Sequence, residues 1–358
     1  MATGVLPKQM LHELTRVGNI SGISENYLNP ASIDLPLSEE AYRVEGVSLP
    51  GHGMKVRDMF ASLGAVPHDL QHPLEAGVSY LIRIEGGWHL PSSVYGYVNP
   101  KSSTGRIFTL SRVIADNVDM YDALVGTGWE GEMWVLVRPE KFPIRVHPGI
   151  ALSQVRLFDG KGFLDELATE LAIKEHGLLF TEKGKKLVHP RNHADSLFLT
   201  LAVKGMMGWE CRGTTKVLDL AKIGAHDPLD FFVPIKARDG MYRLRKDGCY
   251  ILTTKERVMV PPDYSAELRA IDPRFGEFRS HAAGFIDPGW GWGKHGEVCG
   301  RPITLELTMF EDFIVADGQN IARIRYERMK ETPEVLYDSA ASNYTVQQRA
   351  KLAKFFKS

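Results

Sequence analysis

The sequence of 358 residues predicts a mostly β fold with a few short helices, assembled as two diverged copies of one domain. Two observations carry this prediction. Short apolar runs alternate with turn residues along the chain, and its 34 glycines and 20 prolines are spread throughout, a texture typical of many short strands. A series of motifs also occurs twice in the same order, which indicates an internal repeat.

The predicted strands are short runs rich in β-branched and aromatic residues. In the first half they are VSYLIRI (78–84), SVYGYV (93–98), EMWVLV (132–137), FPIRV (142–146) and IALSQVRLF (150–158). Helices are predicted over residues 6–16, 162–176 and the tail 346–356. The second helix has Leu164, Leu167 and Leu171 at helical spacing, which predicts one apolar face.

The internal repeat sets the expected domain boundaries. The first half contains NPKSSTGR (99–106), GTGWEGEMWVLV (126–137) and FPIRVHPGIALSQVRLF (142–158), and the second contains DPRFGEFR (272–279), IDPGW (286–290), ITLEL (303–307) and DFIVADGQNIARIRYERM (312–329). We therefore expect an N-terminal domain at 1–158, a helical and loop connector at 159–203, and a C-terminal domain at 204–358.

Composition excludes several classes of function. The 43 Lys and Arg nearly balance the 44 Asp and Glu, so no global charge favours nucleic acid or an anionic membrane. No apolar run is long enough to span a bilayer, and the N-terminus lacks the apolar core of a signal peptide. The three cysteines form no C-x-x-C pair, which fits a reducing cytoplasm rather than a disulfide framework.

One short loop, KSSTGR (101–106), has the chemistry of a phosphate site. It combines two hydroxyls, a glycine and two cations, and hydroxyls, backbone N–H groups and a guanidinium all suit a phosphate chain. It lacks the Walker A pattern, and a polar turn without a ligand is the alternative.

Two carboxylates of the second half stand out against apolar surroundings. Asp287 lies in AGFIDPGW (283–290), where Asp-Pro-Gly-Trp is a strong turn signal; it is either a plain β-turn or a site where Asp287 binds a sugar hydroxyl and Trp290 forms a pocket wall. Glu306 lies in the strand ITLELTM, where it is either solvent-facing or buried for catalysis. Burial raises the pKa of a carboxyl and makes it a usable base near neutral pH.

The tail and the histidines complete the candidates. SNYTVQQR (342–349) offers Tyr344, Gln347 and Arg349 on a segment that could close over a ligand, with a frayed terminal helix as the alternative. His295-Gly296-Glu297 matches the first piece of the zinc deaminase pattern, H-x-E followed by P-C-x-x-C, but no cysteine pair follows it. A hydrolytic zinc site is therefore not expected.

Taken in order, these motifs resemble the dCTP deaminase family of the dUTPase-like superfamily, in a double-length bacterial form. The matching pieces are Ser102-Ser103-Thr104-Gly105-Arg106, Ala283 to Trp290, Leu305-Glu306 and Tyr344-Thr345-Val346-Gln347. The resemblance covers about residues 75–158 and 240–350. It implies two tandem dUTPase-like domains of the β-clip or distorted jelly-roll type.

The resemblance also implies the chemistry: zinc-independent hydrolytic deamination of dCTP to dUTP and ammonia, with Glu306 as general base. Backbone groups near Ala283 would hold the base and Asp287 the deoxyribose 3′-hydroxyl. The triphosphate, carrying Mg²⁺, would contact Ser102, Ser103, Arg106 and Arg279. A cytoplasmic homo-oligomer based on a trimer is implied, with dTTP a possible inhibitor and neither nucleic acid nor membrane a partner.

Each half departs from the family pattern in a complementary way. The first half has LVGTGW (124–129) where the Asp turn belongs and no Glu in EMWVLV, whereas the second has Phe275-Gly276 where the serine pair belongs. We therefore expect a composite site built from both halves, within one chain or between chains. A dUTPase or bifunctional dCTP deaminase and dUTP diphosphatase is one alternative, and a non-catalytic nucleotide sensor is another.

Overall fold

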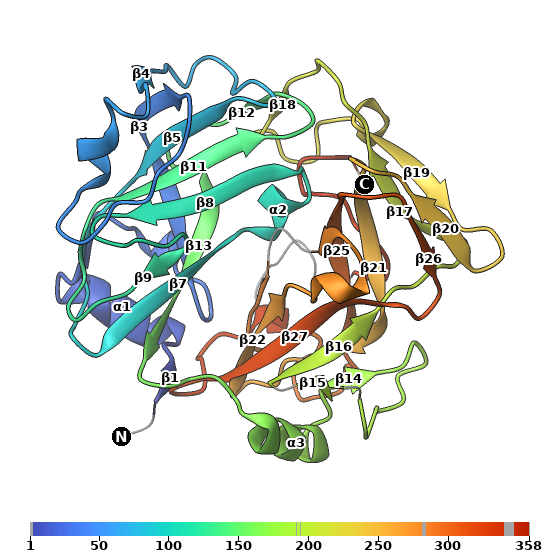
Figure 1. The fold of residues 1–358 in the computed structure, drawn as a ribbon. Helices are drawn as coiled ribbons and strands as arrows, with labels where there is room; N and C mark the ends of the chain where they lie inside the picture. The colour runs from blue at the N-terminus through green and yellow to red at the C-terminus, as the bar shows by residue number, and fades with distance from the viewer. Residues whose placement is uncertain (1–2, 191, 194, 281–283, 340–346, 358) are drawn as a thin grey trace.

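The computed structural model describes residues 3–190, 192–193, 195–280, 284–339 and 347–357. The prediction of a mostly β chain with few helices is confirmed: within these ranges strands dominate, and the α-helices are α1 (Lys8–Arg16), α2 (Ser102–Gly105) and α3 (Glu166–Glu175). The first half of the chain lies on the left of Figure 1 and the second on the right, with α2 between them.

The first half forms one large antiparallel sheet. Its strands occur in the order β8 (Thr109–Ala115), β11 (Met133–Pro139), β5 (Ser79–Ile84), β3 (Ile33–Val44), β13 (Ala151–Asp159), β7 (Val94–Pro100) and β9 (Ala123–Leu124). At its margins β1 (Gly4–Val5) pairs with β13 and β4 (Val66–Pro67) with β3. A smaller sheet contains β10 (Glu130–Gly131), β6 (Gly87–His89) and β2 (Ile20–Ser21). Each run predicted as a strand in this half contains one, although FPIRV (142–146) is a strand only at Ile144–Arg145.

The second half divides its strands between two main sheets. One has the order β19 (Phe232–Lys236), β17 (Met206–Cys211), β21 (Cys249–Val258), β25 (Arg301–Met309) and β23 (Phe278–Ser280), with β14 (Leu179–Phe180) against β21. The other has the order β15 (Asn192–His193), β16 (Ser196–Thr200), β27 (Asn320–Arg328), β22 (Tyr264–Arg269) and β24 (Phe285–Ile286). A separate antiparallel pair contains β20 (Met241–Leu244) and β26 (Phe313–Ala316).

The repeat predicted from the motifs is visible in the strand pairing. In the first half β7 pairs with β13 and β9, and β11 pairs with β8 and β5. In the second half β22 pairs with β27 and β24, and β25 pairs with β23 and β21, in the same chain order. The two halves are therefore two copies of one β arrangement, as the sequence predicts.

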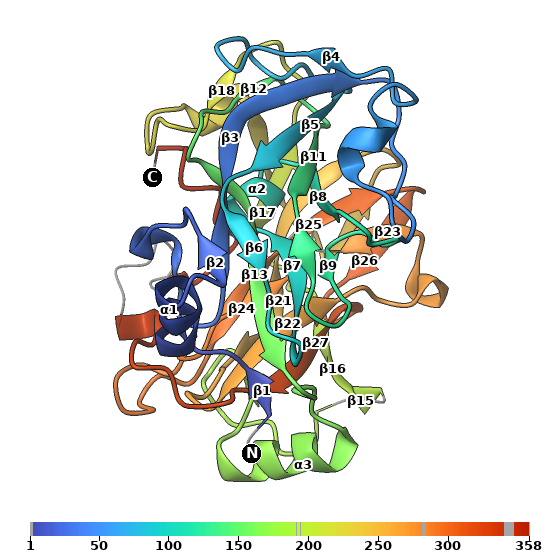
Figure 2. The same ribbon diagram turned by 90° about the vertical axis from the view of Figure 1, so that its left-hand side faces the viewer.

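The helix α3 forms where expected but buries a different face. Asp165 caps its start by accepting a hydrogen bond from Ala168 N–H, and Gly177, in the left-handed region, follows its last turn. Leu164 is buried before the helix, but Leu167 and Leu171 are 66% and 55% exposed. The predicted leucine face is therefore wrong: α3 lies at one end of the molecule (Figure 2) and packs through Thr169, Ala172 and Ile173.

The predicted tail helix is also wrong, since the described part of the tail, residues 347–357, contains no helix. Gly224 N–H donates to the carbonyl of Lys354, and Lys357 N–H donates to the carbonyl of His226. The neighbouring Phe355 and Phe356 are both buried in the core of the first half. Pairing with another segment and burial of consecutive side chains both favour a non-helical chain over an amphipathic helix.

The two halves are interlocked. β12 (Ile144–Arg145) of the first half pairs in parallel with β18 (Leu218–Asp219) of the second. The core of the first half also includes second-half and tail residues: Leu218, Leu220, Phe231, Phe232, Cys249, Ile251, Leu352, Ala353, Phe355 and Phe356. The first half thus completes its hydrophobic core with residues from the second.

Candidate active site

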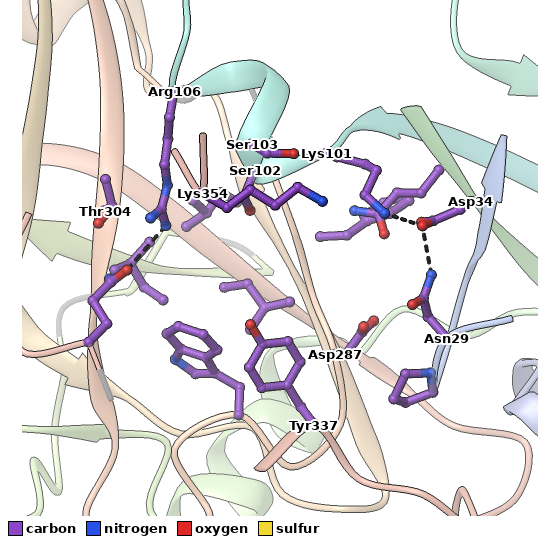
Figure 3. A pocket seen from close by; sticks show the side chains of 18 of the residues that line it. Asn29, Asp34, Lys101, Ser102, Ser103, Arg106, Asp287, Thr304, Tyr337 and Lys354 are labelled. Atoms are coloured by element: carbon purple, nitrogen blue, oxygen red, sulfur yellow. Dashed lines mark hydrogen bonds and ion pairs between the residues drawn. The ribbon is translucent and has the colours of Figure 1, made fainter. Parts of the chain in front are cut away.

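A cavity of about 260 Å³ lies where the two halves meet. The first half contributes Asn29, Pro30, Asp34, Lys101, Ser102, Ser103, Arg106 and Gln154, and the rest of the chain contributes Leu268, Phe285, Ile286, Asp287, Trp290, Ile303, Thr304, Glu306, Tyr337, Gln347 and Lys354. Figure 3 shows Ser102 and Ser103 across the cavity from Asp287 and Tyr337. One chain therefore brings together the serine loop, the Asp turn and the strand glutamate.

The serine loop folds into the short helix α2 and is fixed to strand β13. Lys101 N–H donates to the carbonyl of Leu152 at 2.9 Å, and Thr104 Oγ1 donates to the same carbonyl at 2.8 Å. Thr104 is buried, so its hydroxyl serves the fold, whereas Ser102 and Ser103 line the cavity. The loop thus presents two hydroxyls on a rigid support, the arrangement that polyanion binding requires.

Glu306 is buried rather than solvent-facing, so the solvent-facing alternative for this strand is wrong. It lies on β25, opposite Ile251 of β21, and its side chain is 2% exposed. It forms an ion pair with Arg106 of the first half, whose Nε is 3.7 Å from the Glu306 carboxylate. A buried carboxylate needs such a partner, because burying an isolated charge is costly.

Arg106 is directed at Glu306 and the tail. Its guanidinium donates to Gln347 Oε1 at 3.2 Å and to the carbonyl of Lys351 at 3.0 Å. Gln347 in turn donates to the carbonyl of Pro302 at 2.8 Å, at the start of the Glu306 strand. The serine-loop pattern predicts Arg106 as a phosphate ligand, but these contacts use its guanidinium to connect the loop, Glu306 and the tail.

Asp287 is held by a buried arginine that the sequence motifs do not include. Arg156 of β13 is fully buried, and its Nη2 lies 3.3 Å from Asp287 Oδ1. Burial raises the pKa of the Asp287 carboxyl above its usual range, while the charge of Arg156 opposes the shift. Trp290 packs against Tyr337 with ring centroids 5.1 Å apart, and both line the cavity.

Further residues of the cavity carry polar groups that no motif indicated. Asp34 of β3 forms an ion pair with Lys101 and accepts a hydrogen bond from Asn29 at 2.9 Å (Figure 3). Lys354 reaches the cavity from the tail, and burial lowers its pKa. The sequence offers only one signal that could have indicated Asp34. Like Glu306, it is a charged residue within an apolar strand.

Arg279 does not line this cavity. It lies on β23 and lines a second cavity of about 580 Å³, so the expectation that it contacts the same phosphates as Ser102 is not supported by its position. The sheet arrangement explains the separation, because β23 pairs with the far end of β25, where Arg279 lies opposite Thr308. Ala283 and Tyr344, predicted to hold the base and to close the site, lie outside the described residues.

The H-x-E match is part of a turn. Glu297 accepts hydrogen bonds from the backbone N–H groups of Lys294 and His295, and these lower the pKa of its carboxyl to about 2. The described ranges contain no group of three His, Cys, Asp or Glu side chains arranged to bind a metal ion. Within the same ranges no helix is long and apolar enough to cross a membrane.

Comparisons with known proteins agree with this architecture. Family models match both halves: the 2′-deoxycytidine 5′-triphosphate deaminase N-terminal domain over residues 2–161, and the C-terminal domain of the same family over residues 172–356. No curated protein gives a significant sequence match. The crystal structure of 2′-deoxycytidine 5′-triphosphate deaminase from Agrobacterium tumefaciens is 34% identical and superimposes with a TM-score of 0.86, over 96% of this chain and 100% of that one. The chain therefore belongs to the dCTP deaminase family, in the double-length form with an N-terminal and a C-terminal domain.

Proposed function

We propose that this protein converts dCTP and water into dUTP and ammonia. The observation that carries the proposal is the composition of one cavity: a buried carboxylate, a hydroxyl-rich loop and an Asp turn surround the same space. These groups match the three parts of the substrate: the carboxylate suits the cytosine base that is deaminated, the loop suits the triphosphate, and the Asp turn suits the deoxyribose. Family membership supports the same reaction.

In the proposed reaction Glu306 is the general base. Its carboxylate takes a proton from water, and the resulting hydroxide attacks C4 of cytosine while the carboxyl passes the proton to N3. The proton of the new hydroxyl then moves through the same carboxyl to the amino group. The C4–N4 bond breaks, ammonia leaves and C4 becomes the carbonyl carbon of uracil, so one water is consumed for each ammonia released.

We propose that Arg106 positions Glu306 rather than the phosphates. Its guanidinium, 3.7 Å from the carboxylate and hydrogen-bonded to Gln347 and Lys351, places a fixed positive charge beside Glu306. The charge also aligns the carboxylate with the cavity. This role replaces the phosphate contact expected from the serine-loop motif.

The substrate would lie between the two walls of the cavity. Ser102 and Ser103, with Lys101 and Lys354 nearby, suit the triphosphate, and hydroxyl and ammonium groups are common phosphate ligands. On the opposite wall Asp287 suits the 3′-hydroxyl of the deoxyribose. Mg²⁺, when bound to the triphosphate, would reduce its charge, and the lining residues contact the nucleotide rather than forming a protein cage for the ion.

The decisive experiment is incubation of the purified protein with dCTP and Mg²⁺, with dUTP, dUMP, pyrophosphate and ammonia resolved. The proposal expects dUTP and ammonia in equal amounts. Release of dUMP and pyrophosphate from dCTP would indicate the bifunctional alternative. In a parallel incubation with dUTP, turnover of dUTP without any turnover of dCTP would indicate a dUTPase, which does not need Glu306. Nucleotide binding without any product would indicate a sensor.

We also propose that the reaction is independent of zinc. The support is the spacing of Cys211, Cys249 and Cys299, which form no ligand pair. Treatment with a zinc-selective chelator should leave turnover unchanged, whereas removal of Mg²⁺ should reduce it. Loss of activity on chelation and its return with added zinc would refute this part of the mechanism.

A further inference from the structure

Arg156 connects the two halves directly behind the Asp287 turn. It lies on β13 of the first half with none of its surface exposed. Every carboxylate and ring that its guanidinium contacts belongs to the second half. Its Nη1 donates to Glu327 at 2.7 Å and to the carbonyl of Ala266 at 2.9 Å. Its Nη2 donates to the carbonyl of Ile286 and to Asp287 Oδ1, both at 3.3 Å.

The environment of Arg156 fixes the guanidinium in one orientation. The guanidinium carbon lies 4.2 Å from the centre of the Phe285 ring, and Glu327, its strongest partner, is also held by Ser265 Oγ at 3.0 Å. The planar guanidinium is enclosed by two strands, a carboxylate and an aromatic ring, so it has little freedom to rotate. The Nη2 group therefore meets Asp287 at a defined angle, from behind the cavity wall.

We propose that Arg156 is a positioning residue that orients Asp287 toward the deoxyribose and so sets the requirement for a 3′-hydroxyl. The inference rests on the proposed function, because it assigns a role within the same site. It adds a first-half residue outside the serine loop to the recognition of the sugar. In the absence of Arg156, Asp287 would keep its place in the turn but lose the contact that fixes its carboxylate.

The repeat supplies a matched control. In the first half, Arg156 lies opposite Tyr97 of β7, and Tyr97 lies opposite Ala123 of β9. In the second half, Arg325 lies opposite Glu267 of β22, and Glu267 lies opposite Phe285 of β24. The two arginines thus occupy the same position in the two copies.

Arg325 is also in a comparable environment. It is paired with Glu267 at 3.1 Å and Asp195 at 3.5 Å, and lies 3.7 Å from the Phe163 ring centre. Unlike Arg156, it has no contact with Asp287. Substitution of Arg156 removes a buried ion pair and substitution of Arg325 removes partly buried ones, but only Arg156 adjoins the cavity turn.

The experiment compares dCTP with 2′,3′-dideoxycytidine triphosphate, which lacks the 3′-hydroxyl. We expect the wild-type kcat/KM to favour dCTP, and Arg156→Met to reduce this preference about 10- to 150-fold, the value of a hydrogen bond to a charged group. Arg325→Met should keep the preference. Asp287→Asn should lose it, and adding Arg156→Met to Asp287→Asn should cause little further loss of preference.

The outcomes separate the inference from the function on which it rests. If the wild-type protein does not deaminate dCTP, the proposed function fails. If it does, and Arg156→Met retains the wild-type preference, Arg156 is only a structural ion pair and the inference is wrong. Should Arg156→Met fail to fold, Arg156→Lys decides the matter. Lysine keeps the positive charge but lacks the second N–H group that reaches Asp287, so this variant should fold and still show a reduced preference for dCTP.

Discussion

At the scale of single residues, the site depends on a carboxylate in a place where charge is expensive. Glu306 lies among apolar residues on the buried strand β25, and its ion-pair partner, Arg106, comes from the other half of the chain. Such a pair is poor evidence for stability, because its desolvation cost rivals its attraction. The proposed role of Glu306 as general base explains the presence of this pair better than stability does.

Substitution of Glu306 should therefore affect turnover more than binding. Glu306→Gln keeps the side-chain shape but cannot accept a proton, so we expect kcat for dCTP to fall at least about 100-fold with KM little changed. Steady-state kinetics test this. The control is Glu256→Gln: Glu256 is a half-buried glutamate on β21 that is hydrogen-bonded to Thr200 and does not line the cavity. Equal losses in both variants would contradict the role of Glu306.

A second residue predicts how stability depends on pH. Burial raises the pKa of Asp122 to about 6, although Arg112 is its ion-pair partner. A carboxyl whose pKa rises on folding binds its proton more tightly in the folded state. It therefore contributes stability below the ordinary pKa of an aspartate, and this contribution is lost as pH rises through about 6.

We expect wild type to lose on the order of 3 kcal/mol from this group between pH 4 and pH 6, a loss absent from Asp122→Asn. The Asn side chain can still accept the hydrogen bond that Val113 N–H donates. Denaturant unfolding at several pH values measures the difference between the two proteins. Parallel pH profiles would show that Asp122 does not titrate in this range.

Residues of the site differ in how well the sequence predicts them. Asp287 and Glu306 lie in motifs whose local pattern is informative, a turn signal and a charge within an apolar strand. Arg156 also interrupts an apolar strand, between Val155 and Leu157, but nothing local indicates its partners, which lie at least 110 residues away along the chain. A charged residue within an apolar strand can be recognised from the local sequence, whereas its role depends on which distant segment packs against it.

At the scale of elements, the tail is a structural part of the first half. Phe355 and Phe356 are 3% and 5% exposed in a core otherwise built mainly from residues before 158. The same segment provides Gln347 and Lys354 to the cavity. The tail thus links the stability of the first half to the presence of Gln347 and Lys354 in the cavity.

We therefore expect Phe356→Ala to lower the free energy of unfolding by about 3–5 kcal/mol, the usual cost of removing a buried phenylalanine side chain. Activity should fall with it, because Lys354 and Gln347 lose their anchor. Thermal unfolding and dCTP kinetics measure the two effects. Phe310→Ala, at a position 49% exposed, is the control and should change neither greatly. An unchanged midpoint in Phe356→Ala would show that the tail is not part of the core.

Strands are easier to predict here than helices. The runs around β5, β7, β11 and β13 have local β-branched and aromatic patterns, and they form strands where expected. The tail has a helix-compatible pattern, but its apolar side chains are buried in a core built from residues that are distant in the sequence. In α3 the exposed Leu167 and Leu171 show that spacing alone does not determine which face is buried. Tertiary packing overrides local periodicity in both segments.

At the scale of the whole molecule, the two copies have diverged in a complementary way. The first half keeps the serine loop and lacks the Asp turn and the glutamate, and the second half has the reverse. The sequence leaves open whether such halves meet within one chain or between chains. In the structure Arg106 and Glu306 are ion-paired in a cavity lined by both halves of a single chain. A single chain therefore brings the serine loop, the Asp turn and Glu306 to one cavity.

This arrangement predicts the outcome of mixing two inactive variants. Arg106→Ala removes the cation beside Glu306, and Glu306→Gln removes the base, so each protein alone should lose at least about 100-fold in kcat. Each cavity draws both residues from one chain, so no mixed assembly can combine an intact Arg106 with an intact Glu306. Co-expression of the two variants should thus restore nothing, whereas wild type co-expressed with Glu306→Gln should keep activity in proportion to its wild-type chains. Recovery of a substantial fraction in the doubly mutant mixture would show that the functional site forms between chains, and full activity from residues 204–358 alone would show that the first half is not needed.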